Sequence, residues 1–283
     1  MPEPTDPLIL AGTGLKFVLY AAAVFVTGTL ATIAAGIVEP NGARRWLVRA
    51  AWGGAALLVI AAARFGLLLL QMGDPALAAM IWQVQAPATS ALILGAVVAM
   101  LAGIPQNGLL RAVTCGVGAA AIATSFALTG HAQALETPGL VPIVVAGHVL
   151  LASFWVAAVW VLWPSDRLAS AVLRSRVERF GAIALFAVPP LMAGGVFLGL
   201  QLGGGLSGLT GSLYGATLAA KALVAGAALA VGAGNKWRVT PLLRSDPGRG
   251  RQHLRRALLV DAFLFSGALV AIALATTLYG PAL

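Results

Sequence analysis

Two of the three histidines in this 283-residue chain lie seventeen residues apart, although charged residues make up only 10% of the sequence. His131 follows the end of an apolar run, and His148 lies about two helical turns inside the next run. Met192 is placed at a similar distance from the end of a later run. Imidazole and thioether groups are ligands that Cu(I) accepts in proteins. These three residues are therefore candidate copper ligands.

Four charged side chains lie inside apolar runs and not between them: Lys16, Arg64, Lys221 and Asp261. A charge within a bilayer is costly, so it normally faces the interior of a helix bundle, a partner or water. At a rise of about 1.5 Å per residue, the three cations and His148 all lie roughly 10–12 Å below the outer membrane surface. His131 lies just above them. We predict that these residues line an outward-opening polar layer, in which Asp261 reaches toward Lys221 as a counter-ion.

This polar layer suits three kinds of ligand. Two methionines from the neighbouring outer loop, Met72 and Met80, would add thioethers to a copper site. Three neighbouring cations favour an anion instead, so an anion-handling or lipid-handling protein is a second interpretation. A haem-binding electron-transfer protein is the third, with His131 and His148 as axial ligands and Arg64 or Lys221 at the propionates. The two histidines differ in depth by about 12 Å, which is far for two ligands of one iron.

The elements that position these residues are predicted to be membrane helices. The chain is 60% hydrophobic, its mean hydropathy is +0.93, and its apolar runs are long enough to cross a bilayer. We expect an all-α bundle of eight transmembrane helices, forming one domain over residues 1–283, with residues 72–85 along the membrane interface. Arg-Ala pairs at 111–112 and 256–257 open the fourth and eighth runs, which hints at a duplicated four-helix unit. The eight predicted spans are residues 8–38, 46–71, 86–104, 109–128, 141–163, 176–200, 213–234 and 254–279.

The basic residues predict the orientation of these helices. Lysine and arginine near span ends collect on the cytoplasmic side, and fifteen of the eighteen in this chain lie on alternate loops or the adjoining span ends. Both termini are therefore predicted to be periplasmic. Topology and anionic lipid of the inner leaflet account for the net charge of +9, so membrane lipid is the expected partner and nucleic acid is not. Because no P-loop, kinase or phosphorylated-aspartate motif is present, we do not expect ATP-driven pumping by this chain alone. We do not expect an enzyme.

A resemblance to a known family rests on polar landmarks in the second half of the chain. TGHA at residues 129–132 is followed by GHVLLASFWVAAVW at 147–160, where His148 and Trp155 are two helical turns apart and share a face. This pattern resembles the CopD/PcoD family of bacterial inner-membrane copper resistance proteins. Residues 214–241 are similar to the family in their Tyr-Gly start, intramembrane lysine and Asn-x-x-x-x-x-Pro exit, and residues 254–261 in their Leu-Arg-Arg entry.

The resemblance implies an eight-span inner-membrane protein that brings copper from the periplasm toward the cytoplasm, often beside a periplasmic copper carrier. In this reading His131, His148 and Met192 bind Cu(I), and Trp155 packs beneath His148. Only Met100 and Cys115 continue toward the cytoplasm, so copper binding or delivery without full permeation stays open.

Overall fold

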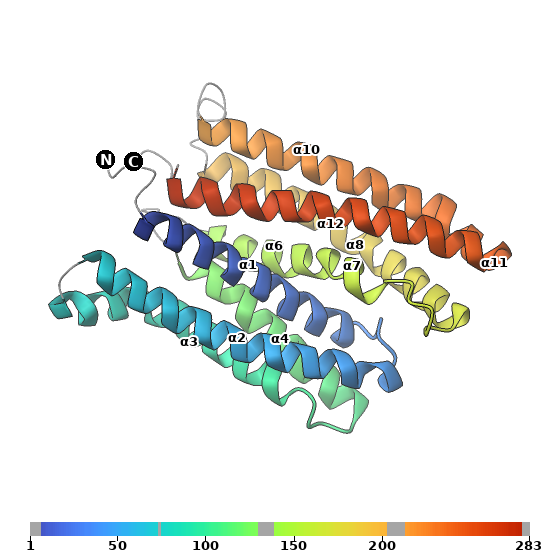
Figure 1. Cartoon of the computed structure of the whole chain (residues 1–283), viewed down its shortest axis with the longest axis horizontal. Coiled ribbons are helices and arrows are strands. Elements are labelled where there is room, and N and C mark those ends of the chain that lie inside the picture. The colour runs from blue at the N-terminus through green and yellow to red at the C-terminus, as the bar shows by residue number, and fades with distance from the viewer. Residues whose placement is uncertain (1–6, 73–74, 130–138, 203–212, 279–283) are drawn as a thin grey trace.

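The structure is a computed structural model that describes the chain except for residues 1–6, 73–74, 130–138, 203–212 and 279–283 (Figure 1). Some helical residues, Met72 and Lys221 among them, are described by their backbone alone. Every described element is a helix, which confirms the all-α prediction. In chain order the elements are α1 (Pro7–Ala34), α2 (Pro40–Met72), the 3-10 helix η1 (Pro75–Leu77), α3 (Ala78–Leu101), α4 (Gly108–Ala127), α6 (Val141–Val156), α7 (Ala158–Val161), α8 (Ser170–Leu202), α10 (Leu213–Gly234), the π-helix η2 (Asn235–Val239), α11 (Thr240–Ser245) and α12 (Pro247–Leu278).

Seven helices in the described part of the chain are long and apolar enough to cross a membrane, so this is a multi-pass membrane protein. They are α1, α2, α3, α4, α6 continued by α7, α8 and α12. At the place of the seventh predicted span lies α10, a helix of 22 residues that is not one of these seven. The count of eight spans and the periplasmic position of both termini therefore stay predictions.

Several helices extend further than the apolar pattern predicts. The structure starts α2 at Pro40, α8 at Ser170 and α12 at Pro247, about two turns before the predicted spans. These added turns contain arginines, which end an apolar run but are good helix formers. The second half of the segment 72–85 forms the first turns of α3, which begins at Ala78, and the predicted interfacial position of this segment stays a prediction.

At the centre of the fold lies α1 (Figure 1), which packs against α2 and α4 on one side and against α6 and α12 on the other. Its crossing with α6 is close because residue 28 is glycine: a Cβ there would lie 2.2 Å from the carbonyl oxygen of Ser153. Nearby, Trp160 Nε1 donates a hydrogen bond of 3.1 Å to Thr29 Oγ1. The two halves of the chain are therefore joined along α1.

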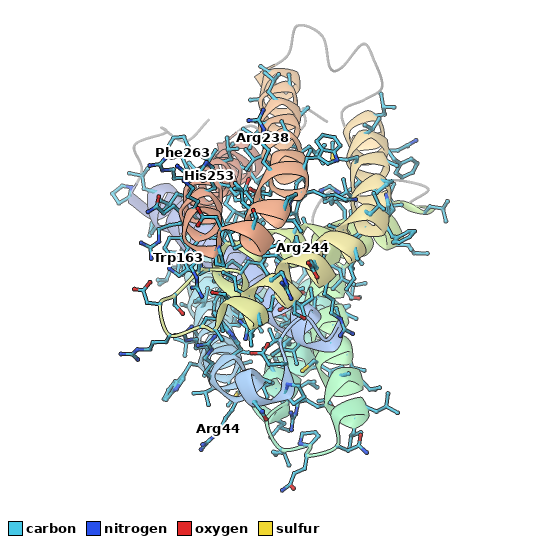
Figure 2. The ribbon with its side chains drawn as sticks, turned by 90° about the vertical axis from the view of Figure 1, so that its right-hand side faces the viewer. Arg44, Trp163, Arg238, Arg244, His253 and Phe263 are labelled. Carbon is cyan, nitrogen blue, oxygen red and sulfur yellow. The ribbon has the colours of Figure 1, made fainter. Side chains whose placement is uncertain are left out.

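One end of the bundle gathers the arginines, as the labelled Arg44, Arg238 and Arg244 show in Figure 2. Arg176 at this end is only 2% exposed, and it donates to both carboxylate oxygens of Glu39 and to the Val161 carbonyl. Partial burial acts to raise the pKa of Glu39, but the hydrogen bond and charge of Arg176 outweigh it and hold that pKa below its ordinary value.

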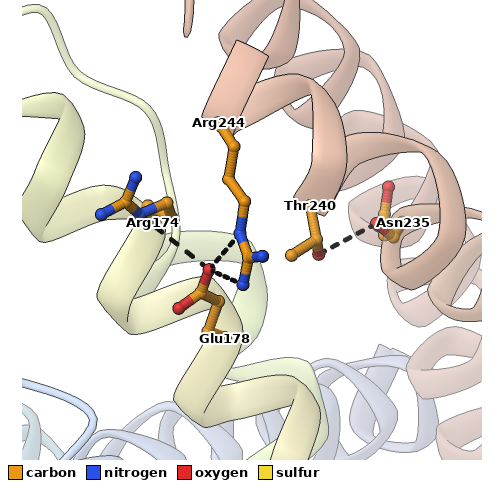
Figure 3. A network of polar contacts seen from close by, with 5 residues as sticks. All are labelled: Arg174, Glu178, Asn235, Thr240 and Arg244. Atoms are coloured by element: carbon orange, nitrogen blue, oxygen red, sulfur yellow. Dashed lines mark hydrogen bonds and ion pairs between the residues drawn. The ribbon is translucent and has the colours of Figure 1, made fainter.

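Two further arginines fix the loops of this end. Arg251 of α12 donates to the Ser165 and Leu168 carbonyls and so holds the loop between α7 and α8. Figure 3 shows Arg244 of α11 donating to Glu178 of α8, with nitrogen–oxygen distances of 2.8 and 3.0 Å. The second contact links α8 to the segment that follows α10.

Candidate metal site

His148 is half-buried on α6, and its imidazole lies against α8. Its Nδ1 atom is 3.1 Å from the carbonyl oxygen of Leu191. A carbonyl oxygen only accepts hydrogen bonds, so Nδ1 carries the proton and donates. In a neutral imidazole the lone pair then lies on Nε2, which is the nitrogen that would bind a metal ion. Metal-binding histidines commonly have their second nitrogen fixed in this way.

Two glycines of α8 make room for this ring. A Cβ at Gly195 would lie 3.2 Å from His148 Cε1, and a Cβ at Gly194 would lie 3.8 Å from His148 Nδ1. A side chain at position 195 would therefore press on the ring. The imidazole lies directly on the backbone of α8, and contacts between the two helices set its orientation.

Met192 lies on the segment of α8 that packs against His148. It directly follows Leu191, the hydrogen-bond acceptor, and its side chain is half-buried. It also precedes Gly195 by three residues, a spacing that puts two residues on neighbouring positions of one helix face. Met192 therefore lies within one helical turn of the residues that contact His148, and its role as a second ligand stays a prediction.

The predicted intramembrane cations form a group on a different pair of helices. Lys16 of α1 and Arg64 of α2 are both half-buried and lie close enough for their charges to repel each other. Tyr20 interacts electrostatically with Arg64. This closeness agrees with the common depth that the helix rise predicts for the two cations. They lie between α1 and α2, whereas His148 lies between α6 and α8.

Asp261 of α12 is 3% exposed, and its Oδ1 atom accepts no hydrogen bond in the part of the chain that the structure describes. The side chain of its predicted partner, Lys221, lies outside the described side chains. One turn further along α12, the ring of Phe265 contacts Trp155 edge-on, with centroids 5.9 Å apart. Trp155 therefore packs on α12, although it shares a helix face with His148.

The remaining predicted site residues are placed as follows. His131 lies outside the described residues, as does the side chain of Met72. Met80 is 53% exposed at the start of α3, which packs on α2 and α4. Among the described residues, no three histidine, cysteine, aspartate or glutamate side chains gather as a metal-binding group, a statement that covers neither methionine nor His131.

One segment in the second half of the chain matches a known protein family. Residues 174–275 match the family model for CopD, described as Copper resistance protein D. This part of the chain, about a third of its length, is similar to CopD. No curated protein and no solved structure gives a significant match to the chain. The CopD match runs from α8 into α12 and contains Met192, Lys221 and Asp261, whereas His131 and His148 precede it. The hydrogen bond from His148 to Leu191 therefore joins the matched region to the helix before it.

Sequence reasoning missed two features around this site. One is the Gly194–Gly195 pair, although adjacent small residues inside an apolar run are a known sign of close helix approach in membranes. The other is the ion pair between the buried Arg176 and Glu39, whose positions are 137 residues apart. A single acidic residue at the start of the first basic loop was the only local sign of that pair.

Proposed function

We propose that the chain belongs to the CopD family, that it binds Cu(I) inside the bacterial inner membrane at a site built on His148, and that it moves the ion from the periplasm toward the cytoplasm. His131 and Met192 supply the further ligands. The hydrogen bond from His148 Nδ1 to the Leu191 carbonyl carries this proposal, because it orients the ring and places the lone pair of the neutral imidazole on Nε2. The match of residues 174–275 to Copper resistance protein D supports copper as the ion.

The ligand types suit Cu(I) more than a divalent ion. Imidazole and thioether are neutral ligands of the softness that Cu(I) prefers, whereas Mg²⁺, Ca²⁺ and Mn²⁺ prefer carboxylate, carbonyl and water. A neutral ligand set also needs no buried acidic side chain beside His148. A periplasmic copper carrier is the partner that would deliver the ion to this end of the bundle.

Asp261 supports a path that continues past the first site. Its buried carboxylate lies one turn from the Trp155–Phe265 contact and has no described hydrogen-bond partner at Oδ1. A carboxylate in a membrane span normally faces a partner, water or an ion. A cation that left His148 would be attracted toward this group.

The test is a Cu(I) titration of purified protein in detergent against a coloured Cu(I) chelator. Wild-type protein is expected to bind one Cu(I) per chain, and His148→Ala to lower the affinity by about 100-fold or more. His253→Ala is the control, because His253 makes a similar Nδ1 contact of 3.0 Å with the Arg249 carbonyl but is exposed. Equal affinity in wild type and His148→Ala would refute the site, and a Soret band in the same sample would support haem instead.

A pair of glycine variants tests the geometry without removing a ligand. Gly195→Ala places a methyl group 3.2 Å from His148 Cε1, so it should displace the ring and weaken Cu(I) binding by about 10-fold. Gly199→Ala, on the same helix, meets nothing within 4 Å and should leave the affinity unchanged. If both variants bind like the wild type, the contact between the ring and α8 does not set the site.

A further inference from the structure

Two adjoining cavities open at the arginine-rich end of the bundle, on the first turns of α2. The larger has a volume of about 650 Å³ and is lined by Glu39, Asn41, Gly42, Arg44, Arg45, Val48, Arg49 and Leu168. The smaller has a volume of about 320 Å³ and is lined by Pro40, Arg44, Leu47, Val48, Ala51, Met100, Gly103 and Arg111. Since Arg44 and Val48 line both, the cavities form one continuous depression.

The charge in the larger cavity is not neutralised by the protein. Arg44, Arg45 and Arg49 make no hydrogen bond or ion pair with any residue that the structure describes. The single carboxylate of the lining, Glu39, is bound by the buried Arg176. Three guanidinium groups with free donors therefore surround a space large enough for a phosphate group and its ester substituents.

Two of these guanidinium groups are held in place by an aromatic ring. The guanidinium carbons of Arg45 and Arg49 lie 5.4 and 4.6 Å from the ring centroid of Trp46, which is itself only 4% exposed. Cation–π contacts of this length stabilise the position of an arginine while its donors stay available. Trp46 thus positions two of the three arginines that line the larger cavity.

The smaller cavity adds an apolar wall that leads into the membrane. Val48 of α2 and Met100 of α3 are 51% and 44% exposed, and Leu47 and Ala51 of α2 line the same cavity. Both α2 and α3 are candidate membrane spans, so this wall faces the hydrocarbon region next to the arginines. An apolar wall does not stabilise a bound soluble anion, whereas the acyl chain of a lipid packs favourably against it.

We propose that this depression binds an anionic phospholipid of the inner leaflet. Its phosphate lies among Arg44, Arg45 and Arg49, and one acyl chain lies along Val48, Ala51 and Met100. Basic pockets between membrane helices on the cytoplasmic side are a recurring way to bind such headgroups. The bound lipid would tie the start of α2 to the end of α3, on the side of the bundle away from His148.

The test compares lipids by native mass spectrometry of delipidated protein in a neutral detergent. Dioleoyl phosphatidylglycerol should bind more tightly than dioleoyl phosphatidylcholine at low salt, by a factor on the order of 100 for three arginines. Glycerol phosphate and inorganic phosphate, which lack acyl chains, should bind much more weakly than the anionic lipid. Equal binding of the two lipids, or equal binding of soluble phosphate and lipid, would overturn the proposal.

Charge-matched variants locate the site. The triple variant Arg44→Gln, Arg45→Gln, Arg49→Gln should lose the preference for the anionic lipid. A control triple, Arg167→Gln, Arg238→Gln, Arg256→Gln, removes three exposed arginines that line neither cavity and should keep the preference. An equal loss in both triples would show that net charge alone binds the lipid and would refute a defined site.

A variant that keeps every arginine tests the apolar wall. Gly103 lines the smaller cavity, and a Cβ there meets nothing within 4 Å, so Gly103→Trp fills the groove without disturbing the fold. Binding of the anionic lipid should weaken by about 10-fold, while the melting temperature stays that of the wild type. Unchanged lipid binding in this variant would contradict the placement of the acyl chain.

Discussion

The first four long helices and the later helices are packed in different ways. In the first half, α1, α2, α3 and α4 contact one another in a closed ring. In the second half, α8 packs on α6 and α11, and α10 packs on α12, with no comparable contact between α8 and α10 in the residues that the structure describes. In the most apolar stretch of each span, the share of residues buried inside the protein is 50% in α1, 28% in α3 and 33% in α4, whereas it is 11% in both α2 and α8.

This difference bears on the proposed copper site. The closed ring of α1, α2, α3 and α4 places buried side chains around α1, and we call these four helices the frame. The half that matches CopD contains α8, which meets the frame mainly through α6 and contributes the backbone that holds His148. A ligand site at the edge of a rigid unit can change its geometry without repacking the whole bundle, which is a requirement for releasing a bound ion.

The largest expected effect comes from the junction between the halves. Gly28→Ala puts a Cβ 2.2 Å from the Ser153 carbonyl oxygen, so α1 and α6 must separate, and the folded protein should lose at least about 3 kcal/mol or fail to form. Gly14→Ala on the same helix meets nothing within 4 Å and should be neutral. The measurement is the yield and melting temperature of purified protein. Equal stability of the two variants would show that the halves are not joined at Gly28.

The next effect concerns the ion pair between the buried Arg176 and the partly exposed Glu39, which holds α8 to the start of α2. Glu39→Gln leaves the charge of Arg176 buried without a counter-ion, and it should cost about 2 kcal/mol. Glu178→Gln removes an acidic residue whose partner Arg244 is 64% exposed, so it serves as the control with a much smaller loss. Chemical unfolding in detergent measures both, and equal losses would contradict the importance of burial.

The same pair predicts a pH dependence. The pKa of Glu39 is lowered in the folded state, so the pair contributes its full stability above the unfolded-state pKa of a glutamate, about 4.3. This contribution is lost as the pH falls through the lower folded-state pKa, because the folded protein must then take up the proton. The melting temperature of the wild type should therefore fall more than that of Glu39→Gln as the pH decreases through this acidic range. If the two melting temperatures fall in parallel, this pH dependence does not come from Glu39.

A smaller effect, of opposite sign, is expected in the open half. Asp261→Asn replaces a buried carboxylate with no described partner at Oδ1 by a neutral amide, and it should raise the stability by about 1 kcal/mol. Asp166→Asn changes an exposed residue and is the control. Melting temperatures report both, together with copper uptake, which should fall in Asp261→Asn if the carboxylate attracts the ion. A destabilised Asp261→Asn would reveal a partner for the carboxylate.

The smallest effect is expected at the link between α8 and α11 in Figure 3. The ion pair of Arg244 and Glu178 lies at the surface, so a double-mutant cycle should give a coupling of about 0.3 kcal/mol. Arg174 is 3.9 Å from the same carboxylate and should couple still less. A coupling above about 1 kcal/mol would mean that the second half is held more firmly than its packing indicates.

The sequence predicts the helices well because hydropathy is a local property. The span at residues 213–234 coincides with α10, and Lys16 and Arg64 lie together as the helix rise predicts. Hydropathy and the helix rise do not predict in which direction each side chain points. That His148 contacts α8 and Trp155 contacts α12 depends on how three helices cross. The arginine-containing helix ends and the Arg176–Glu39 pair depend on contacts outside the apolar runs.

X-ray absorption at the copper edge of Cu(I)-loaded protein tests the proposed site most directly. The account predicts a spectrum with both nitrogen and sulfur ligands, in which Met192→Leu loses the sulfur contribution and His148→Ala loses nitrogen. His253→Ala should leave the spectrum unchanged. A wild-type spectrum without imidazole nitrogen, or one that is identical in His148→Ala, would contradict copper binding at the contact between α6 and α8.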